Sequence, residues 1–233
     1  GQTGKFHTDW GDFHSFKNKE ALSYECFRML AFNAKCLIGD QLDPDGRISP
    51  AVYDLVGSVY SEVEKKEPWC AGAVPVCDMA IFTPESYVTP IGTGAVPPSV
   101  CGASAMLEEM GCQFDIIDNL SDFTRYKLLI LPDEVSVDDE LKAKLQAYLA
   151  QGGKILASGL SGLERTEDGA KPEFALPELG TSYIGPAPCY PDFILPNDTL
   201  GKQLPKTEHV MYQKGQEVKP TTGKVLMDCA VPY

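Results

Sequence analysis

The feature that most limits the fold is a series of short, mainly apolar segments separated by amphipathic helical patterns. Helical patterns begin at Ser99 and after Asp138, and glycines follow them at Gly111 and Gly152. Strands that are apolar along their whole length are covered on both faces, and helical crossovers join parallel strands. The middle of the chain is therefore predicted to be an α/β domain with a three-layer open parallel sheet. Its expected strands are 79–82, 114–117, 127–131 and 154–157.

The residues before this domain repeat the same rhythm. Asn18 can cap a helix over 19–34, whose apolar residues form one stripe, and 36–39 is a short buried strand that ends at Asp40. Ser49 followed by Pro50 is typical of the start of another helix. The first part is thus expected to be a βαβα segment.

Three regions follow from these patterns. Beyond about residue 165 the chain becomes rich in Pro and Gly, which predicts an extended tail that packs on the α/β domain. The expected strands of the tail lie near 181–184, 192–195, 208–213 and 224–229. The predicted regions are a βα segment over 1–75, an α/β domain over 76–165 and the tail over 166–233.

Composition excludes several classes of partner. The formal charge is −13, and no basic stripe suited to phosphate groups is present, so nucleic acid is not expected as a partner. No apolar run approaches the roughly 18 residues of a membrane span, so no membrane is expected either. The first residues do not resemble a signal peptide, which leaves a cytoplasmic or a periplasmic location open. Eight cysteines without any CxxC pair favour buried thiols over disulfides, and no metal site is expected.

The stretch from Lys5 to His14 holds the densest group of functional residue types. A sugar ring stacks on an aromatic face while its hydroxyls meet polar side chains, and glycoside hydrolysis uses a pair of carboxyl groups. The alternative is that the aromatic residues pack into a core and the aspartates cap turns. The candidate catalytic residues are Asp9, Asp12 and Asp40. The candidate substrate-binding residues are His7, Trp10, His14 and Gln41.

A second candidate region is the set of loops that follow the strands of the α/β domain, because ligands bind there in open sheets. These loops are Thr83–Glu85, Asp118, Pro132–Glu134 and Ser158–Ser161. The loop Ala157-Ser158-Gly159-Leu160-Ser161-Gly162 has no cysteine and does not match the G-x-S-x-G motif of serine hydrolases. Both nucleotide motifs, G-x-G-x-x-G and G-x-x-x-x-G-K-[ST], are absent, so no cofactor is expected.

Two blocks of sequence carry a family resemblance. FHTDWGDF, YECFRMLA and CLIGDQLDPDGRI, between Gly4 and about Ile48, resemble the last barrel segments of glycoside hydrolases. AIFTPE, YKLLILPDE and LAQGGKILASG, between Met79 and Gly162, are similar to the domain named after beta-galactosidase trimerisation. That domain is flavodoxin-like and class I glutamine amidotransferase-like.

The resemblance implies that residues 1–70 are the end of a (β/α)8 barrel, or TIM barrel, whose active site lies at the carboxyl ends of its strands. Asp9, Trp10, Asp12 and Asp40 would then line a sugar pocket. The chain would be a fragment that is inactive alone, part of a glycosidase that binds carbohydrate and forms a homo-oligomer. Two alternatives stay open. They are a non-catalytic oligomerisation module and an independent amidotransferase-like or flavodoxin-like enzyme.

Overall fold

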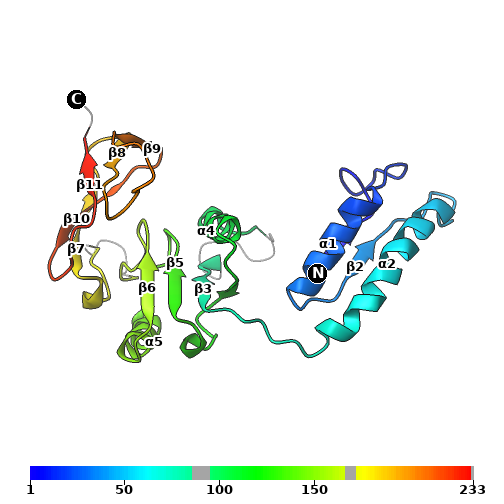
Figure 1. Cartoon of the computed structure of the whole chain (residues 1–233), viewed down its shortest axis with the longest axis horizontal. Helices are drawn as coiled ribbons and strands as arrows, with labels where there is room; N and C mark the ends of the chain where they lie inside the picture. The colour runs from blue at the N-terminus through cyan, green and yellow to red at the C-terminus, as the bar shows by residue number, and fades with distance from the viewer. Residues whose placement is uncertain (86–94, 166–171, 232–233) are drawn as a thin grey trace. The chain divides into compact units, whose positions relative to one another are not determined.

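The computed structural model describes residues 1–85, 95–165 and 172–231 of the chain. These residues fall into two compact units, Gly1–Val76 and Cys77–Tyr233. Figure 1 labels their helices and strands. The segment 86–98 is rich in Gly, Pro and Thr, which predicts a loop, and most of it lies outside the described residues.

The first unit is a βαβα segment, as the sequence predicts. Its elements are β1 (Gln2–Gly4), α1 (Lys19–Ala31), β2 (Leu37–Gly39) and α2 (Pro50–Cys70). Strands β1 and β2 pair in parallel, with Gly4 opposite Gly39. Leu22 and Cys26 of α1 pack with Val59 and Val63 of α2 in a small buried core.

Helix α1 ends three residues earlier than predicted. Asn18 caps its start by accepting a hydrogen bond from the Ala21 amide at 2.8 Å. At the other end Asn33 adopts a left-handed backbone with φ of 57°, which stops the helical hydrogen bonds after Ala31.

The second unit contains the predicted parallel sheet. The strands are β3 (Met79–Phe82), β4 (Phe114–Ile117), β5 (Leu128–Leu131) and β6 (Lys154–Ala157), in the order β4-β3-β5-β6. Helices α4 (Pro98–Glu109) and α5 (Asp139–Ala150) pack on opposite faces, α4 against Ile81 and Ile130 and α5 against the larger core around Leu129. The predicted three-layer α/β fold is therefore confirmed.

The two faces of this sheet are covered unequally. One row of side chains crosses the α4 face in register from Ile116 through Ile81 and Ile130 to Leu156. The two central side chains are buried, whereas Ile116 and Leu156 on the edge strands are 53% and 52% exposed. Helix α4 thus covers the centre of this face and leaves its flanks open.

The tail forms antiparallel strands, and its last predicted strand is misplaced. Strand β7 (Thr181–Pro186) pairs with β10 (Gln216–Pro220), and β8 (Asp192–Leu195) lies between β9 (His209–Met211) and β11 (Asp228–Ala230). The sequence pattern did not predict β10. The strand expected over 224–229 begins later, as β11 at Asp228, because only the end of the expected segment pairs with β8. Ala175 and Leu176, near the start of the tail, are buried in the core around Leu129.

Candidate functional site

The carboxyl ends of β1 and β2 bring together the residues that the sequence singles out. Thr3 faces helix α1, where its hydroxyl donates a hydrogen bond of 2.5 Å to Glu25, and Ile38 packs into the core between α1 and α2. Side chains alternate along a strand, so the next residues, Gly4 and Gly39, face away from the helices. The last paired position of the two strands therefore has no side chains on that face.

Two aromatic rings occupy the space above these glycines. A Cβ atom built on Gly39 would lie 2.3 Å from the Trp10 ring, and one built on Gly4 would lie 3.0 Å from the Phe6 ring. The two rings contact each other with centroids 4.9 Å apart. Phe6 is buried, but half of the Trp10 side chain stays exposed. The Trp10 indole therefore packs on Gly39 and Phe6 at the strand ends, and its other side is open to solvent.

The loop Phe6–Phe16, which carries Trp10, is tied to both strands. At its base the Lys17 amide donates to the Lys5 carbonyl oxygen at 2.8 Å. At its tip the Gly11 amide donates to Oε1 of Gln41 at 2.9 Å, and Gly11 has a φ of 98° that favours glycine. This bond orients the Gln41 amide so that its Nε2 donors are directed away from Gly11.

The three candidate carboxylates all take part in local hydrogen bonds. Asp9 accepts from the Trp10 amide at 2.7 Å, and Asp12 accepts from the Thr8 hydroxyl at 2.8 Å. Hydrogen bonds from Thr8 and Ser15 lower the pKa of Asp12 below its usual value. Asp9 is exposed and Asp12 half-buried.

Asp40 lies in a different environment from the other two carboxylates. Its side chain is only 15% exposed, its Oδ1 accepts from the Gln41 amide at 2.8 Å, and the same oxygen lies 3.9 Å from Lys5 Nζ. The Lys5 side chain is 2% exposed and was not among the predicted site residues. Its position directly after β1 was the available signal, because residues at that edge of parallel strands are the ones that reach a site.

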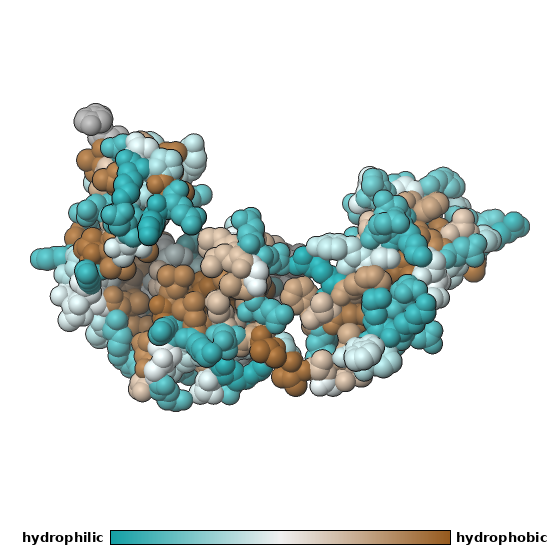
Figure 2. Space-filling view, viewed as in Figure 1, coloured by the Kyte–Doolittle hydropathy of each residue, from teal (hydrophilic) through white to brown (hydrophobic). Residues whose placement is uncertain are grey.

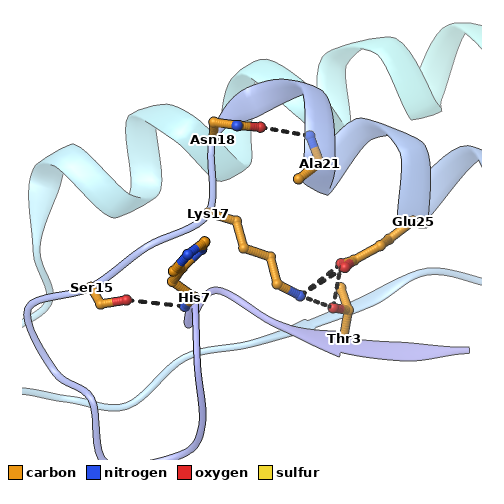
Figure 3. Close-up of polar contacts among 7 residues, drawn as sticks. All are labelled: Thr3, His7, Ser15, Lys17, Asn18, Ala21 and Glu25. Atoms are coloured by element: carbon orange, nitrogen blue, oxygen red, sulfur yellow. Dashed lines mark hydrogen bonds and ion pairs between the residues drawn. The ribbon is translucent and has the colours of Figure 1, made fainter.

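Below the loop, a cluster of charges joins β1 to α1 (Figure 3). Lys17 Nζ donates to the Thr3 hydroxyl at 2.8 Å and to both carboxylate oxygens of Glu25 at 2.9 and 2.8 Å. Burial would raise the pKa of Glu25, but the hydrogen bonds from Lys17 and Thr3 outweigh it and lower the pKa. This cluster lies on the helix side of β1, so it links β1 to α1 and lies on the opposite face from Gly4 and Gly39.

The two histidines are exposed members of the loop. The His7 amide donates a hydrogen bond to the Ser15 hydroxyl oxygen at 3.1 Å (Figure 3), and His14 directly precedes Ser15 on the same loop. The structure thus places His7, Asp9, Trp10, Asp12 and His14 on one loop. Gln41 joins this loop through its bond to Gly11.

In the second unit, polar groups of the loops at the carboxyl ends of the strands form hydrogen bonds within and between these loops. Ser158 Oγ donates to Asp133 at 2.7 Å, and the buried Ser161 hydroxyl accepts from the Val135 amide at 3.1 Å. Asp118 accepts from the amide and the hydroxyl of Ser121 at 3.1 and 2.9 Å.

A serine nucleophile needs a base, and the chain's three histidines are His7, His14 and His209. None lies in the loops of this sheet. In the parts of the chain that the structure describes, no cluster of His, Cys, Asp and Glu suits a metal ion. In the described loops, Ser158, Ser161 and Ser121 thus use their hydroxyls in hydrogen bonds within the loops.

All eight cysteines lie in the described part and are unpaired thiols there. Burial and the neighbouring Cys36 raise the pKa of Cys26 to about 11, so this thiol stays protonated at neutral pH. No helix in the described ranges is long and apolar enough to cross a membrane.

Known proteins resemble both units of the chain. Residues 105–181 match the family model of the beta-galactosidase trimerisation domain. The alpha-L-fucosidase isoenzyme 2 of Paenibacillus thiaminolyticus is 41% identical over 100% of this chain, with a TM-score of 0.87. No curated protein sequence matches the chain.

More distant structures share the fold. The beta-galactosidase of Bacillus circulans sp. alkalophilus is 15% identical over 100% of this chain, and that of Rahnella sp. R3 is 16% identical over 98%, each with a TM-score of 0.74. The chain covers 38% of each of these structures and 35% of the fucosidase, so it spans little more than a third of its relatives. Residues 105–181 thus match the beta-galactosidase trimerisation domain, and the chain as a whole is similar to about a third of an alpha-L-fucosidase and shares its fold with part of GH42 beta-galactosidases.

Proposed function

We propose that the protein containing this chain hydrolyses glycosides, with α-L-fucosides as the first substrate class to test. The observation that carries the proposal is the 41% identity with an alpha-L-fucosidase over the whole chain. The beta-galactosidases are far less similar, at 15 to 18% identity for those with a TM-score near 0.7. β-D-Galactosides are therefore the second substrate class.

In this proposal, the Phe6–Phe16 loop forms one wall of the sugar site. The exposed half of the Trp10 ring offers an apolar face on which the C–H groups of a pyranose can stack. Gln41 has a fixed orientation and offers amide donors to sugar hydroxyls, and His7 and His14 add polar groups on the same loop. These residues would bind and orient the sugar.

The candidate carboxylates have different proposed roles. Asp12 has a lowered pKa, which suits a carboxylate that stays ionised, as a nucleophile or base does. Asp9 is exposed on the same loop, whereas Asp40 lies near Lys5 and fits a supporting role. Substitution of each by asparagine in the intact protein separates these roles, because loss of a reacting carboxylate lowers kcat by orders of magnitude.

Turnover of 4-nitrophenyl α-L-fucopyranoside and 4-nitrophenyl β-D-galactopyranoside by the intact protein tests the activity. Trp10→Ala should raise KM for the hydrolysed substrate by up to about 10-fold, since a stacking contact with an aromatic ring contributes roughly 0.5 to 1.5 kcal/mol. Trp69→Ala is the matched control, because Trp69 is 86% exposed at the end of α2. Absence of turnover with both substrates would refute the proposal.

We also propose that the second unit mediates assembly between copies of the protein. The matched family is named for trimerisation, and the flanks of the α4 face expose Ile116 and Leu156, both within residues 105–181. Hydrophobic surface gathers over the region of β5 and β6 in Figure 2. Exposed apolar patches of this kind mark interaction sites, and a second copy of the chain is the proposed occupant.

Light scattering of the intact protein tests this assembly. Leu156→Glu should shift the mass toward the monomer, because a carboxylate would be buried without a partner in the interface. Leu204→Glu is the control, since Leu204 is an exposed leucine of the tail. A monomeric wild-type protein, or an unchanged mass in Leu156→Glu, would contradict the proposed surface.

A further inference from the structure

The most deeply buried charged side chain in the described residues is that of Lys5, which is 2% exposed. It follows β1 directly, and its ammonium group lies under the Phe6–Phe16 loop. Removing an ammonium group from water is costly, so a buried lysine normally has polar partners that compensate the lost hydration. The partners of Lys5 therefore indicate what the charge does.

These partners come from the loop and from the second strand. Nζ donates to the carbonyl oxygen of Phe13 at 2.6 Å, and it lies 3.9 Å from Oδ1 of Asp40. It also lies 4.8 Å from the centroid of the Phe6 ring. One charge thus joins the far side of the loop, the end of β2 and the ring that contacts Trp10.

The loop has few other attachments near Trp10. Its base is closed by the Lys17 amide and its tip by Gln41, whereas Phe13 lies on the returning arm between them. Lys5 is the buried charge that holds this arm, together with the hydrogen bond from the His7 amide to the Ser15 hydroxyl. Without the ammonium group, the Phe13 carbonyl and the Asp40 carboxylate would each lose a charged partner in a poorly hydrated place.

We infer that Lys5 is a positioning residue for sugar binding: it fixes the loop so that the Trp10 ring stays over Gly39 and faces the sugar. The inference rests on the proposed glycosidase function, since the sugar is the ligand. Lys5 itself is covered by the loop and would not touch the substrate. Its effect would be seen in KM, because the loop carries the stacking residue.

The test is a double-mutant cycle in the intact protein, with 4-nitrophenyl α-L-fucopyranoside or whichever of the two aryl glycosides is hydrolysed. Lys5→Met should raise KM by up to about 10-fold with kcat changed by less than about 3-fold, since through the loop it can remove no more than the stacking contribution of Trp10. In a Trp10→Ala background, Lys5→Met should have little further effect on KM. Such non-additivity is expected when one residue acts through the other.

Lys17→Met is the matched control. Lys17 is another partly buried lysine of the same unit, but its ammonium group binds Thr3 and Glu25 on the helix side. The Lys17→Met substitution should destabilise α1 and leave KM unchanged. If Lys5→Met does not fold, Lys5→Arg replaces it: the retained charge should preserve folding, while the larger planar group displaces the loop and raises KM.

Additive effects of Lys5→Met (or Lys5→Arg) and Trp10→Ala on KM would overturn the inference, as would an equal rise of KM in Lys17→Met. Failure of the glycosidase proposal looks different. In that case the wild-type protein hydrolyses neither aryl glycoside, and a KM for the variants cannot be measured.

Discussion

Substitution of Gly39 by alanine tests whether the strand end was built to hold the Trp10 ring. The added Cβ would lie 2.3 Å from Cη2 of Trp10, and ordinary contact begins at 3.4 Å, so the ring edge must move by at least about 1.1 Å, the difference between the two. The backbone of Gly39 lies outside the left-handed region, so alanine itself is not strained there. The effect of the substitution thus falls on the indole.

The magnitude follows from the contacts that the movement disturbs. Trp10 is half exposed and can shift, so overpacking should cost about 1 to 2 kcal/mol, the lower part of the range for crowded sites. Loss of the contact between the Phe6 and Trp10 rings accounts for about 0.5 to 1.5 kcal/mol of this. Displacement of the ring should raise KM for the aryl glycoside by up to about 10-fold, which is the effect of losing its stacking contact altogether.

Two measurements on the intact protein check the prediction. Amide hydrogen exchange of the first unit reports the local free energy of opening, and steady-state kinetics report KM. Gly57→Ala is the control: Gly57 lies within α2, a Cβ there meets nothing within 4 Å, and alanine should stabilise the helix by about 0.5 to 1 kcal/mol without changing KM. Unchanged exchange of the Phe6–Phe16 loop together with unchanged KM in Gly39→Ala would refute the reasoning.

Three further predictions concern the supporting structure. Glu25→Gln should lower the free energy of opening of α1, measured by amide exchange at neutral pH, by about 1 kcal/mol, because the charged hydrogen bonds of Glu25 are lost. The pKa of Glu25 is lowered in the folded state, so the difference from wild type should disappear as the pH falls through that folded pKa, and a pH-independent difference would contradict the role of the Glu25 charge. Gly153→Ala should destabilise the sheet of the second unit by about 1 to 3 kcal/mol, because a Cβ would lie 2.2 Å from the buried ring of Tyr148, and unchanged exchange of β6 would show that the ring is free to move. Asp138→Ala should cost about 1 kcal/mol of helix stability, measured as faster exchange in the first turn of α5, since it removes the cap on the Leu141 amide; Asp139→Ala, without that bond, should cost less.

Much of the fold could be predicted from local sequence because its elements are set by local patterns. The strands at Met79–Phe82, Phe114–Ile117 and Lys154–Ala157 have the predicted bounds, since each is a short, mainly apolar run. The capping aspartate at 138 and asparagine at 18 mark helix starts in the structure as in the sequence. The tail was harder, because strand β10 is mostly exposed and polar, and its pairing with β7 depends on residues far apart in the chain.

The candidate site shows the limit of local patterns more clearly. The sequence determined which residues would be near one another: an aromatic and acidic stretch after one short strand, and Asp40 with Gln41 after the next. Only the tertiary structure decided their roles, because these depend on which face of the strand pair each side chain occupies. The register of β1 with β2 placed two glycines side by side and opened the space for the Phe6 and Trp10 rings. The same pairing buried Lys5 beside Asp40, since the distance between two charges is set by packing across the strands and not by their spacing in the chain.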